Sequence, residues 1–412
     1  MIEIEARLWE LESLGLQRTT KHVSGPQGPR VVLDGKPVLL LCSNNYLGLA
    51  DHPRVRTAAA EAAMRWGAGA GASRLVSGTM TPHRRLEERL AEFKGRDCAL
   101  LFGSGYLANT GVIAALTRPG DVVFSDERNH ASIIDGCRMS RAETFVYDHG
   151  DLDHLEWGIE HAEGRGALIV TDSVFSMDGD IAPLQGLVEV AARHGVRLVV
   201  DEAHATGTIG PGGRGALALE GLEDQVDVIV GTLGKALGSY GAFVACERAM
   251  MHYLVNAART FIFSTAPSPP SVAAALAALE LLEERPHRIA KLQANAAALR
   301  AELELLGFDV GDSHTHIVPL IVGDADRAVR LCEAGLRRGV FAQAIRPPTV
   351  PPQTSRLRLS AMASHSQAEL RAAARTLAEA ARTCGLEPSL LGRMPLDDGE
   401  DSDSDESLAR AA

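Results

Sequence analysis

The chain has 412 residues, a mass of 43.8 kDa, 46% hydrophobic residues and a formal net charge of -12. This length suffices for one large α/β domain and a smaller one, and the negative charge argues against nucleic acid as the main partner. Residues 397–406 alone carry seven acidic side chains. Such a segment cannot bury apolar surface, so we expect a disordered acidic tail over residues 391–412 that is dispensable for chemistry.

The six cysteines lie far apart and form no C-x-x-C pair, which is typical of core thiols in a reducing compartment. Residues 1–5 lack the layout of a signal peptide, and the most apolar window, 99–116, is interrupted by glycine and polar residues. We therefore expect a cytoplasmic protein that does not bind membranes. His314 and His316 form an H-x-H pair without a nearby third ligand, so no metal site is expected.

The first part of the chain predicts a helix and a hairpin. Residues 4–16 have apolar positions at helical spacing, and residues 31–41 read as two strands joined by an Asp-Gly turn. A polar cluster at 42–49 then precedes a helix over 53–66. The Asn and Ser side chains of this cluster suit either ligand contact or helix capping.

Two glycine-containing segments follow. Residues 67–74 superficially resemble a dinucleotide-binding fingerprint, but they follow a helix rather than a strand, so this interpretation is excluded. Residues 99–106 lead from an apolar run into a helix over 107–116. Small residues and free amides at a helix start can bind a phosphate, although a strand-to-helix turn without a ligand has the same pattern.

Short β-branched runs recur at 121–125, 167–171, 196–200 and 226–230, with helical patterns between them. This alternation predicts a mostly parallel sheet. Polar residues follow each run, and ligands bind at the carboxyl ends of strands in open α/β sheets. We therefore expect these polar residues to converge at one edge of the sheet.

Lys235 lies in the glycine-rich turn after the last of these runs, with no charged residue nearby in sequence. Its ammonium either reaches water or acts as a nucleophile, because burial lowers the pKa of a lysine amine. A Walker A loop is excluded, since Ile229 and Ala236 replace the required glycine and Ser/Thr. A lysine, a phosphate cradle, Asp201 at a strand end and nearby histidines are the parts that a pyridoxal phosphate site needs.

Four motifs resemble the α-oxoamine synthases, which are pyridoxal phosphate enzymes of the type I aminotransferase fold: residues 129–132, 175–179, 201–207 and 231–243. The resemblance covers about residues 44–365. It implies an α/β fold with a mostly parallel central sheet, helices on both faces and a small α+β C-terminal domain. It also implies a homodimer with shared active sites.

The family joins an amino acid to an acyl thioester with loss of carbon dioxide. Residues 344–359 are most similar to members that use L-alanine and a pimeloyl thioester in biotin synthesis, the acyl group being carried by coenzyme A or a carrier protein. Pro352 and Gln353 depart from the pattern, because relatives often have a glycine before the following threonine.

The predicted organisation has four parts. An N-terminal helix and hairpin segment takes residues 1–45, a large cofactor-binding domain 46–285, a small C-terminal domain 286–390, and the tail the remainder. Within the small domain the pattern predicts helices over 288–306, 325–338 and 367–384, and strands over 317–322, 340–345 and 357–360.

The resemblance also assigns roles at the cofactor. Lys235 is the Schiff-base lysine, Asp201 faces the pyridine nitrogen, and His204 and Ser176 donate hydrogen bonds to the phenolic oxygen. His130 stacks on the ring and contacts the substrate. The phosphate is bound by Gly105, Tyr106 and Thr232 and, across the dimer interface, by Ser264 and Thr265.

The remaining implied roles concern the substrates. Arg358 and Asn44 hold the amino acid carboxylate, Thr349 contacts the acyl substrate, and Arg18 meets its distal carboxylate. Three other functions stay open: a family member using glycine and a short acyl-CoA, an ordinary aminotransferase, and a non-catalytic cofactor-binding protein.

Overall fold

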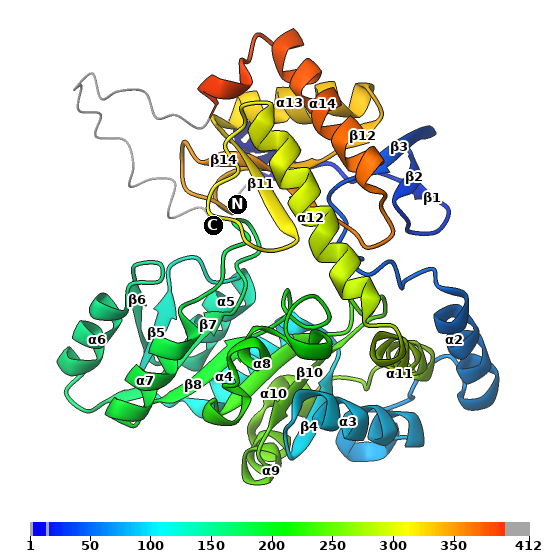
Figure 1. Cartoon of the computed structure of the whole chain (residues 1–412). Helices are drawn as coiled ribbons and strands as arrows, with labels where there is room; N and C mark the ends of the chain where they lie inside the picture. Colours follow the sequence, from blue (N-terminus) through cyan, green and yellow to red (C-terminus); the bar gives the residue numbers. More distant parts are fainter. Residues whose placement is uncertain (1–2, 14–15, 392–412) are drawn as a thin grey trace. The chain divides into compact units, whose positions relative to one another are not determined.

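The computed structural model describes residues 3–13 and 16–391, which form two compact units (Figure 1). The terminal unit consists of the described residues within 1–43, 177–179 and 292–412, and the central unit of residues 44–176 and 180–291. The predicted tail lies largely outside the described residues. The four-part division predicted from the sequence stays a prediction.

The terminal unit contains two small sheets. The first has the order β1-β2-β3-β12, in which β3 and β12 are parallel, and the second the order β11-β14-β13, which is antiparallel. Its elements are α1 (Ile4–Ser13), β1 (Val23–Ser24), β2 (Arg30–Leu33), β3 (Lys36–Leu40), α12 (His287–Leu305, in this unit from Leu292), β11 (Ile317–Gly323), α13 (Ala325–Arg337), β12 (Val340–Phe341), β13 (Gln343–Ile345), β14 (Ser355–Ser360) and α14 (Gln367–Thr383).

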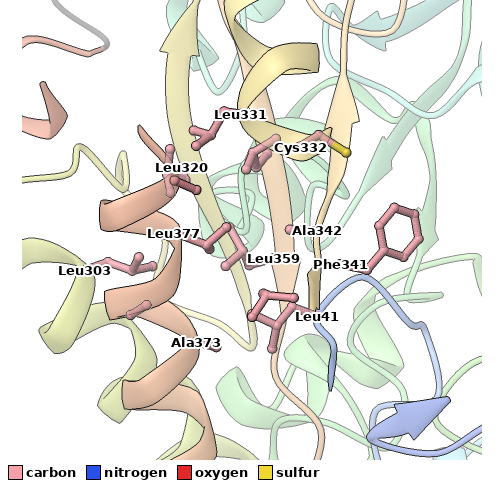
Figure 2. Packing of buried hydrophobic residues seen from close by; sticks show 14 of the residues in the cluster. Leu41, Leu303, Leu320, Leu331, Cys332, Phe341, Ala342, Leu359, Ala373 and Leu377 are labelled. Atoms are coloured by element: carbon pink, nitrogen blue, oxygen red, sulfur yellow. The ribbon is translucent and has the colours of Figure 1, made fainter. Parts of the chain in front are cut away.

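Among the described residues, a hydrophobic core holds the terminal unit together. Figure 2 shows side chains from both sheets and from α12, α13 and α14 directed toward one another, among them Leu41, Leu303, Leu331 and Leu377. The sequence also determines where the helices begin. Asp324 accepts a hydrogen bond from Arg327 N, and Ser366 forms a capping box with Glu369.

The central unit is built on a seven-stranded sheet of order β4-β10-β9-β8-β7-β5-β6. Neighbouring strands are parallel except at β10, which is antiparallel to both β4 and β9. Its elements are α2 (Pro53–Trp66), a π-helix (Arg74–Gly78), α3 (Thr81–Lys94), β4 (Cys98–Phe102), α4 (Gly105–Leu116), β5 (Val122–Asp126), α5 (Ala131–Ser140), β6 (Glu143–Tyr147), α6 (Leu152–His161), β7 (Gly166–Asp172), α7 (Leu184–His194), β8 (Arg197–Asp201), α8 (Ala216–Glu220), β9 (Val228–Thr232), β10 (Ala242–Cys246), α9 (Arg248–Ala257), α10 (Arg259–Ile262) and α11 (Pro269–Glu284).

Both faces of this sheet are buried except at the outer strand β6, which is mostly exposed. One face packs against α4, α5, α9 and α10 through a cluster that includes Phe102, Val170, Val230 and Val244. Alternate residues of the same strands, such as Phe124 and Phe243, are also buried and so point to the opposite face. This double burial explains why the strands read as continuous apolar runs. The predicted mostly parallel sheet is confirmed.

Two local features bear on the sequence predictions. The helix predicted over 4–16 is observed over Ile4–Ser13, and residues 14 and 15 lie outside the described residues. Gln353 has φ 59°, a left-handed conformation that glycine adopts more readily. This conformation explains why a glycine suits that turn. Among the described helices, none is long and apolar enough to cross a membrane.

Candidate active site

A cavity of about 160 Å³ lies at the carboxyl ends of the strands of the central unit. Residues after β5, β7, β8 and β9 meet there with the first turn of α4, because parallel strands present their carboxyl ends at the same edge. The lining residues are Gly105, Tyr106, His130, Ser132, Asp172, Asp201, Ala203, His204, Thr232 and Lys235. Seven of them belong to the set predicted from the sequence.

Asp201, the last residue of β8, is 96% buried, and both of its carboxyl oxygens accept hydrogen bonds. Its Oδ2 accepts a hydrogen bond of 2.6 Å from Asn109 Nδ2, and its Oδ1 accepts one of 2.7 Å from Ala203 N. A buried carboxylate needs such donors to keep its charge. The two carboxyl oxygens are thereby held at one point of the cavity wall.

His130 caps α5 and is linked to Asp201 through Asn109. The Asn109 amide also donates to Ser132 Oγ at 2.9 Å, which leaves the Ser132 hydroxyl to donate to His130 Nδ1 at 2.7 Å. Burial lowers the pKa of His130, the attraction of Asp201 opposes this only in part, and Lys235 lowers it further. The ring is therefore neutral, with its proton on Nε2.

Asp172, the last residue of β7, shares the cavity wall with Asp201. Burial, together with repulsion from Asp201, raises the pKa of Asp172 well above its usual value. Its Oδ2 accepts a 2.7 Å hydrogen bond from His130 N. Asp172 thus fixes the backbone of His130 rather than adding a second full charge to the site.

Lys235 reaches the cavity from the turn after β9. Its Nζ lies 2.8 Å from His204 Nε2, and the side chain is partly buried. The backbone of this turn packs closely against Ala50 at Gly238, which has φ +60°. A Cβ at this position would stand only 2.4 Å from Ala50 N, so the turn requires a glycine. The close packing of this turn against the backbone at Ala50 therefore helps to position the amine.

The first turn of α4 and Thr232 offer an anion site. The N–H groups of Gly105 and Tyr106 have no intrahelical acceptor, and Ser104 caps the helix by accepting from Leu107 N. Thr232 Oγ1 accepts from Gly234 N and donates to Gly241 O, each at 3.2 Å. A dianionic phosphate suits this set of donors.

The other predicted residues lie elsewhere. Ser176, Ser264 and Thr265 do not line the cavity in the described part of the chain, and Thr265 pairs with Ser73 in an isolated β-bridge. Arg18 and Thr349 are exposed in the terminal unit. Arg358 is buried in β14 of that unit, where its Nη1 donates to Ser360 Oγ at 3.1 Å.

Comparisons with known proteins identify the family. A sequence model of the aminotransferase class I and II family matches residues 36–377. An 8-amino-7-oxononanoate synthase from Citrifermentans bemidjiense is 52% identical, over 92% of this chain and 98% of that protein. The chain belongs to the aminotransferase class I and II family. Within it, the chain is an α-oxoamine synthase, as the sequence motifs predicted.

Solved structures agree with this placement. A serine palmitoyltransferase variant from S. paucimobilis, solved with a pyridoxal phosphate–myriocin adduct, superposes with a TM-score of 0.88 at 34% identity, over 93% of this chain and 97% of that one. The 8-amino-7-oxononanoate synthase of Francisella tularensis gives a TM-score of 0.72 at 26% identity, over 85% and 99%. The predicted type I aminotransferase fold is confirmed.

The cavity of this α-oxoamine synthase fits pyridoxal phosphate, the cofactor of the family. It combines a buried carboxylate, a lysine amine, a neutral histidine and a helix start with free amides, at Asp201, Lys235, His130 and Gly105. A Cβ on Gly105 would meet no atom within 4 Å, so the helix start faces open space. These groups match the pyridinium, aldehyde, ring face and phosphate of the cofactor.

Asn109, Tyr46 and Asp172 are among the residues near the site that were not assigned a role from the sequence. Asn109 and Tyr46 lie in segments read as helix and as capping cluster, where a polar residue has no distinguishing spacing. Asp172 ends a predicted strand, as Asp201 does. Its position at a strand end was therefore a usable signal.

A buried ion pair supports the loop after Asp201. Lys94 Nζ lies 2.6 Å from Glu202 Oε2 and 2.8 Å from Thr206 Oγ1, and Glu202 Oε1 accepts from Leu217 N at 2.8 Å. The side chains of Lys94 and Glu202 are 0% and 1% exposed. This pair ties the 202–217 loop to the end of α3.

Replacing Glu202 with glutamine is expected to destabilise the fold by about 3–5 kcal/mol, because it leaves the Lys94 ammonium buried without its counter-charge. A separate cycle combines Lys94→Met with Glu202→Leu, and this double change should cost less than the sum of Lys94→Met alone and Glu202→Leu alone. Chemical denaturation of the four proteins measures this coupling. Additive costs would contradict the assigned pairing.

His149 bridges two carboxylates near the site, those of Asp126 and Asp180. Its Nδ1 lies 3.0 Å from Asp126 Oδ1 and its Nε2 lies 2.8 Å from Asp180 Oδ2. Burial opposes a charge on the ring, but the hydrogen bonds and attraction of both carboxylates outweigh it and raise the pKa of His149 to about 9. The charged ring thus joins the end of β5 to the end of the loop that carries Ser176.

Because this pKa is raised in the folded state, the stabilisation is fully present below the unfolded value near 6.5 and is lost as pH rises through about 9. We expect the free energy of unfolding to fall by up to about 3 kcal/mol over this range in the wild type. His149→Gln should lack this component, whereas the exposed His252→Gln should retain it. If denaturation shows the same pH dependence of the free energy of unfolding in both variants, the assigned bridge between His149 and the two carboxylates is wrong.

Proposed function

We propose that this enzyme condenses L-alanine with a pimeloyl thioester to give 8-amino-7-oxononanoate, carbon dioxide and free thiol in biotin biosynthesis. One observation carries the proposal. The amine of Lys235, His204 and the fixed carboxylate of Asp201 line one cavity in a chain that is 52% identical to an 8-amino-7-oxononanoate synthase over nearly its whole length. A cytoplasmic location is part of the same proposal.

When bound, pyridoxal phosphate supplies an electron sink for bonds broken at the α-carbon of an amino acid. Lys235 Nζ would hold the cofactor covalently, and the same amine would remove the α-proton of alanine. Asp201 would keep the ring nitrogen protonated. His204 would bind the phenolic oxygen, and the sequence motif assigns Ser176 to the same oxygen although it does not line the cavity. His130 would support the ring face and donate from Nε2–H to the substrate.

The remaining roles concern anchoring. Gly105 and Tyr106 offer their amides to the phosphate, and Thr232 assists them. The substrate carboxylate is assigned to Arg358 with Asn44. Thr349 contacts the acyl chain, and Arg18 meets its distal carboxylate.

A thiol-release assay with a panel of substrates tests the proposal. The panel crosses L-alanine, glycine and L-serine with pimeloyl, acetyl and palmitoyl thioesters, each offered on coenzyme A and, for pimeloyl, on an acyl carrier protein. We expect thiol release with alanine and pimeloyl thioester to exceed the other pairs. A preference for glycine with acetyl-CoA would contradict the proposal and indicate 2-amino-3-ketobutyrate CoA ligase activity instead. Transfer of the amino group without thiol release would indicate an aminotransferase.

The enzyme is also proposed to be a homodimer in which Ser264 and Thr265 complete the phosphate site of the partner subunit. Phe263 beside them is 70% exposed, and Leu75 and Val76 of the adjoining π-helix are 53% and 79% exposed. Such apolar side chains are expected at an interface. Sedimentation should give a dimer at assay concentration, and Phe263→Asp should weaken it; a fully active monomer would exclude shared sites.

A further inference from the structure

A row of hydrogen bonds runs from the candidate catalytic lysine to the polar cluster before α2. Lys235 Nζ lies 2.8 Å from His204 Nε2, His204 Nδ1 lies 2.8 Å from Tyr46 Oη, and Tyr46 Oη lies 2.9 Å from Asn44 Oδ1. Tyr46 is fully buried and His204 is 95% buried. All four residues belong to the central unit.

The chemistry of the last pair sets the direction of the row. The Asn44 carbonyl oxygen can only accept, so the single hydrogen of the Tyr46 hydroxyl is donated to it. The Tyr46 oxygen can then only accept from His204, which places a proton on Nδ1. A neutral His204 consequently presents the lone pair of Nε2 to the Lys235 amine.

Packing keeps Tyr46 and His204 in place against the lysine loop. The backbone of the Tyr46 turn is folded back by the bonds Tyr46 N to Asn44 O at 2.8 Å and Ala50 N to Asn45 Oδ1 at 3.1 Å. A Cβ on Gly207, in the turn after His204, would stand 2.6 Å from the Cβ of Ala236. The turn after His204 therefore approaches the lysine loop as closely as glycine permits.

We propose that Tyr46 is a positioning residue that holds the proton of His204 on Nδ1 and so makes His204 Nε2 the proton acceptor of Lys235. The proposal rests on the proposed function for its catalytic meaning, but the protonation state itself is a property of the cofactor-free chain. Tyr46 touches neither cofactor nor substrate in this scheme. It acts through His204.

One consequence concerns the loaded enzyme. The family resemblance has His204 donating to the phenolic oxygen of pyridoxal phosphate. A ring whose Nδ1–H is committed to Tyr46 can donate from Nε2 only when it carries a second proton. His204 should therefore be an imidazolium opposite a negatively charged oxygen in the loaded enzyme.

The direct test is nitrogen NMR of the full-length, cofactor-free protein labelled with 15N-histidine, at about pH 8 where a free histidine is neutral. The His204 signal is identified by its loss in His204→Gln. We expect wild-type His204 to carry its proton on Nδ1. In Tyr46→Phe the ratio of the two tautomers should shift toward Nε2–H by roughly tenfold, which corresponds to the loss of one hydrogen bond.

A chemical readout accompanies the spectrum. With its proton on Nε2, His204 donates to the uncharged amine of Lys235 instead of accepting from the ammonium, so the uncharged, reactive form is favoured. Reductive methylation of Lys235, followed by peptide mass spectrometry, should therefore be roughly tenfold faster in Tyr46→Phe. The exposed Lys36 and Lys291 serve as internal references.

Two further variants serve as a control and as an independent test. Tyr253→Phe removes a tyrosine hydroxyl that donates to Ala115 O at 2.9 Å outside the cavity, and it should change neither readout. Asn44→Leu removes the acceptor of the Tyr46 hydrogen, which is then free to donate to His204, and it should shift the tautomer as Tyr46→Phe does. An Nε2–H tautomer in the wild type, or an unchanged tautomer in both Tyr46→Phe and Asn44→Leu, would overturn the proposal, whatever reaction the enzyme performs.

Discussion

Lys235→Ala is expected to abolish product formation and to leave no cofactor covalently bound after borohydride reduction. Lys235 is the lysine that lines the cavity in the described part of the chain, with its Nζ 2.8 Å from His204 Nε2. The same amine is assigned both the attachment and the proton transfer, so its loss should lower kcat by at least about 10⁴-fold. Mass spectrometry of reduced peptides measures the attachment and the thiol assay measures turnover.

The matched control is Lys291→Ala, which removes an exposed lysine of the central unit. This variant should keep full cofactor attachment and full activity. A reduced adduct mapped to another lysine in the wild type would overturn the assignment of Lys235.

Asp201→Asn should leave pyridoxal phosphate bound but slow exchange of the alanine α-proton with solvent by about 10³-fold. Opposite charges about 4 Å apart at an effective dielectric near 20 interact by about 4 kcal/mol, which is equivalent to about three powers of ten in rate. An asparagine retains the size of Asp201 but cannot hold a proton on the ring nitrogen. Cofactor absorbance measures occupancy, and proton NMR of alanine in deuterium oxide measures exchange.

Asn109→Ala is the companion variant, because Asn109 Nδ2 donates to Asp201 Oδ2 at 2.6 Å. It should slow exchange less than Asp201→Asn, since Ala203 N still holds the carboxylate. Exchange at the wild-type rate in Asp201→Asn would refute the assigned role of the charge.

The parallel strands β5, β7, β8 and β9 could be predicted because they are largely buried, whereas the parallel strand β6 (Glu143–Tyr147), which is mostly exposed, was not predicted. The runs at 121–125, 167–171, 196–200 and 226–230 fall within two residues of β5, β7, β8 and β9. By contrast, β10 (Ala242–Cys246) was not predicted, since it follows a glycine-rich turn and has no helix before it. Its antiparallel insertion between β4 and β9 depends on tertiary pairing rather than on local pattern.

The same distinction applies to the site. Asp201, His204 and Lys235 stand at strand ends or in glycine-rich turns, where sequence position alone indicates convergence. Asn109 lies on the second turn of an apolar helix, and its contact with Asp201 joins residues 92 positions apart. Tyr46 and His204 are separated by 158 positions. Such contacts follow from the packing of the folded chain, so no local spacing predicts them.

The fate of carboxyl-labelled alanine tests the central claim most directly. The enzyme is incubated with pyridoxal phosphate, L-alanine labelled with 13C at the carboxyl group and pimeloyl-CoA, and the products are identified by mass spectrometry. The account predicts equal amounts of labelled carbon dioxide, free coenzyme A and unlabelled 8-amino-7-oxononanoate. Labelled pyruvate without thiol release, or a condensation product that retains the labelled carboxyl group, would contradict it.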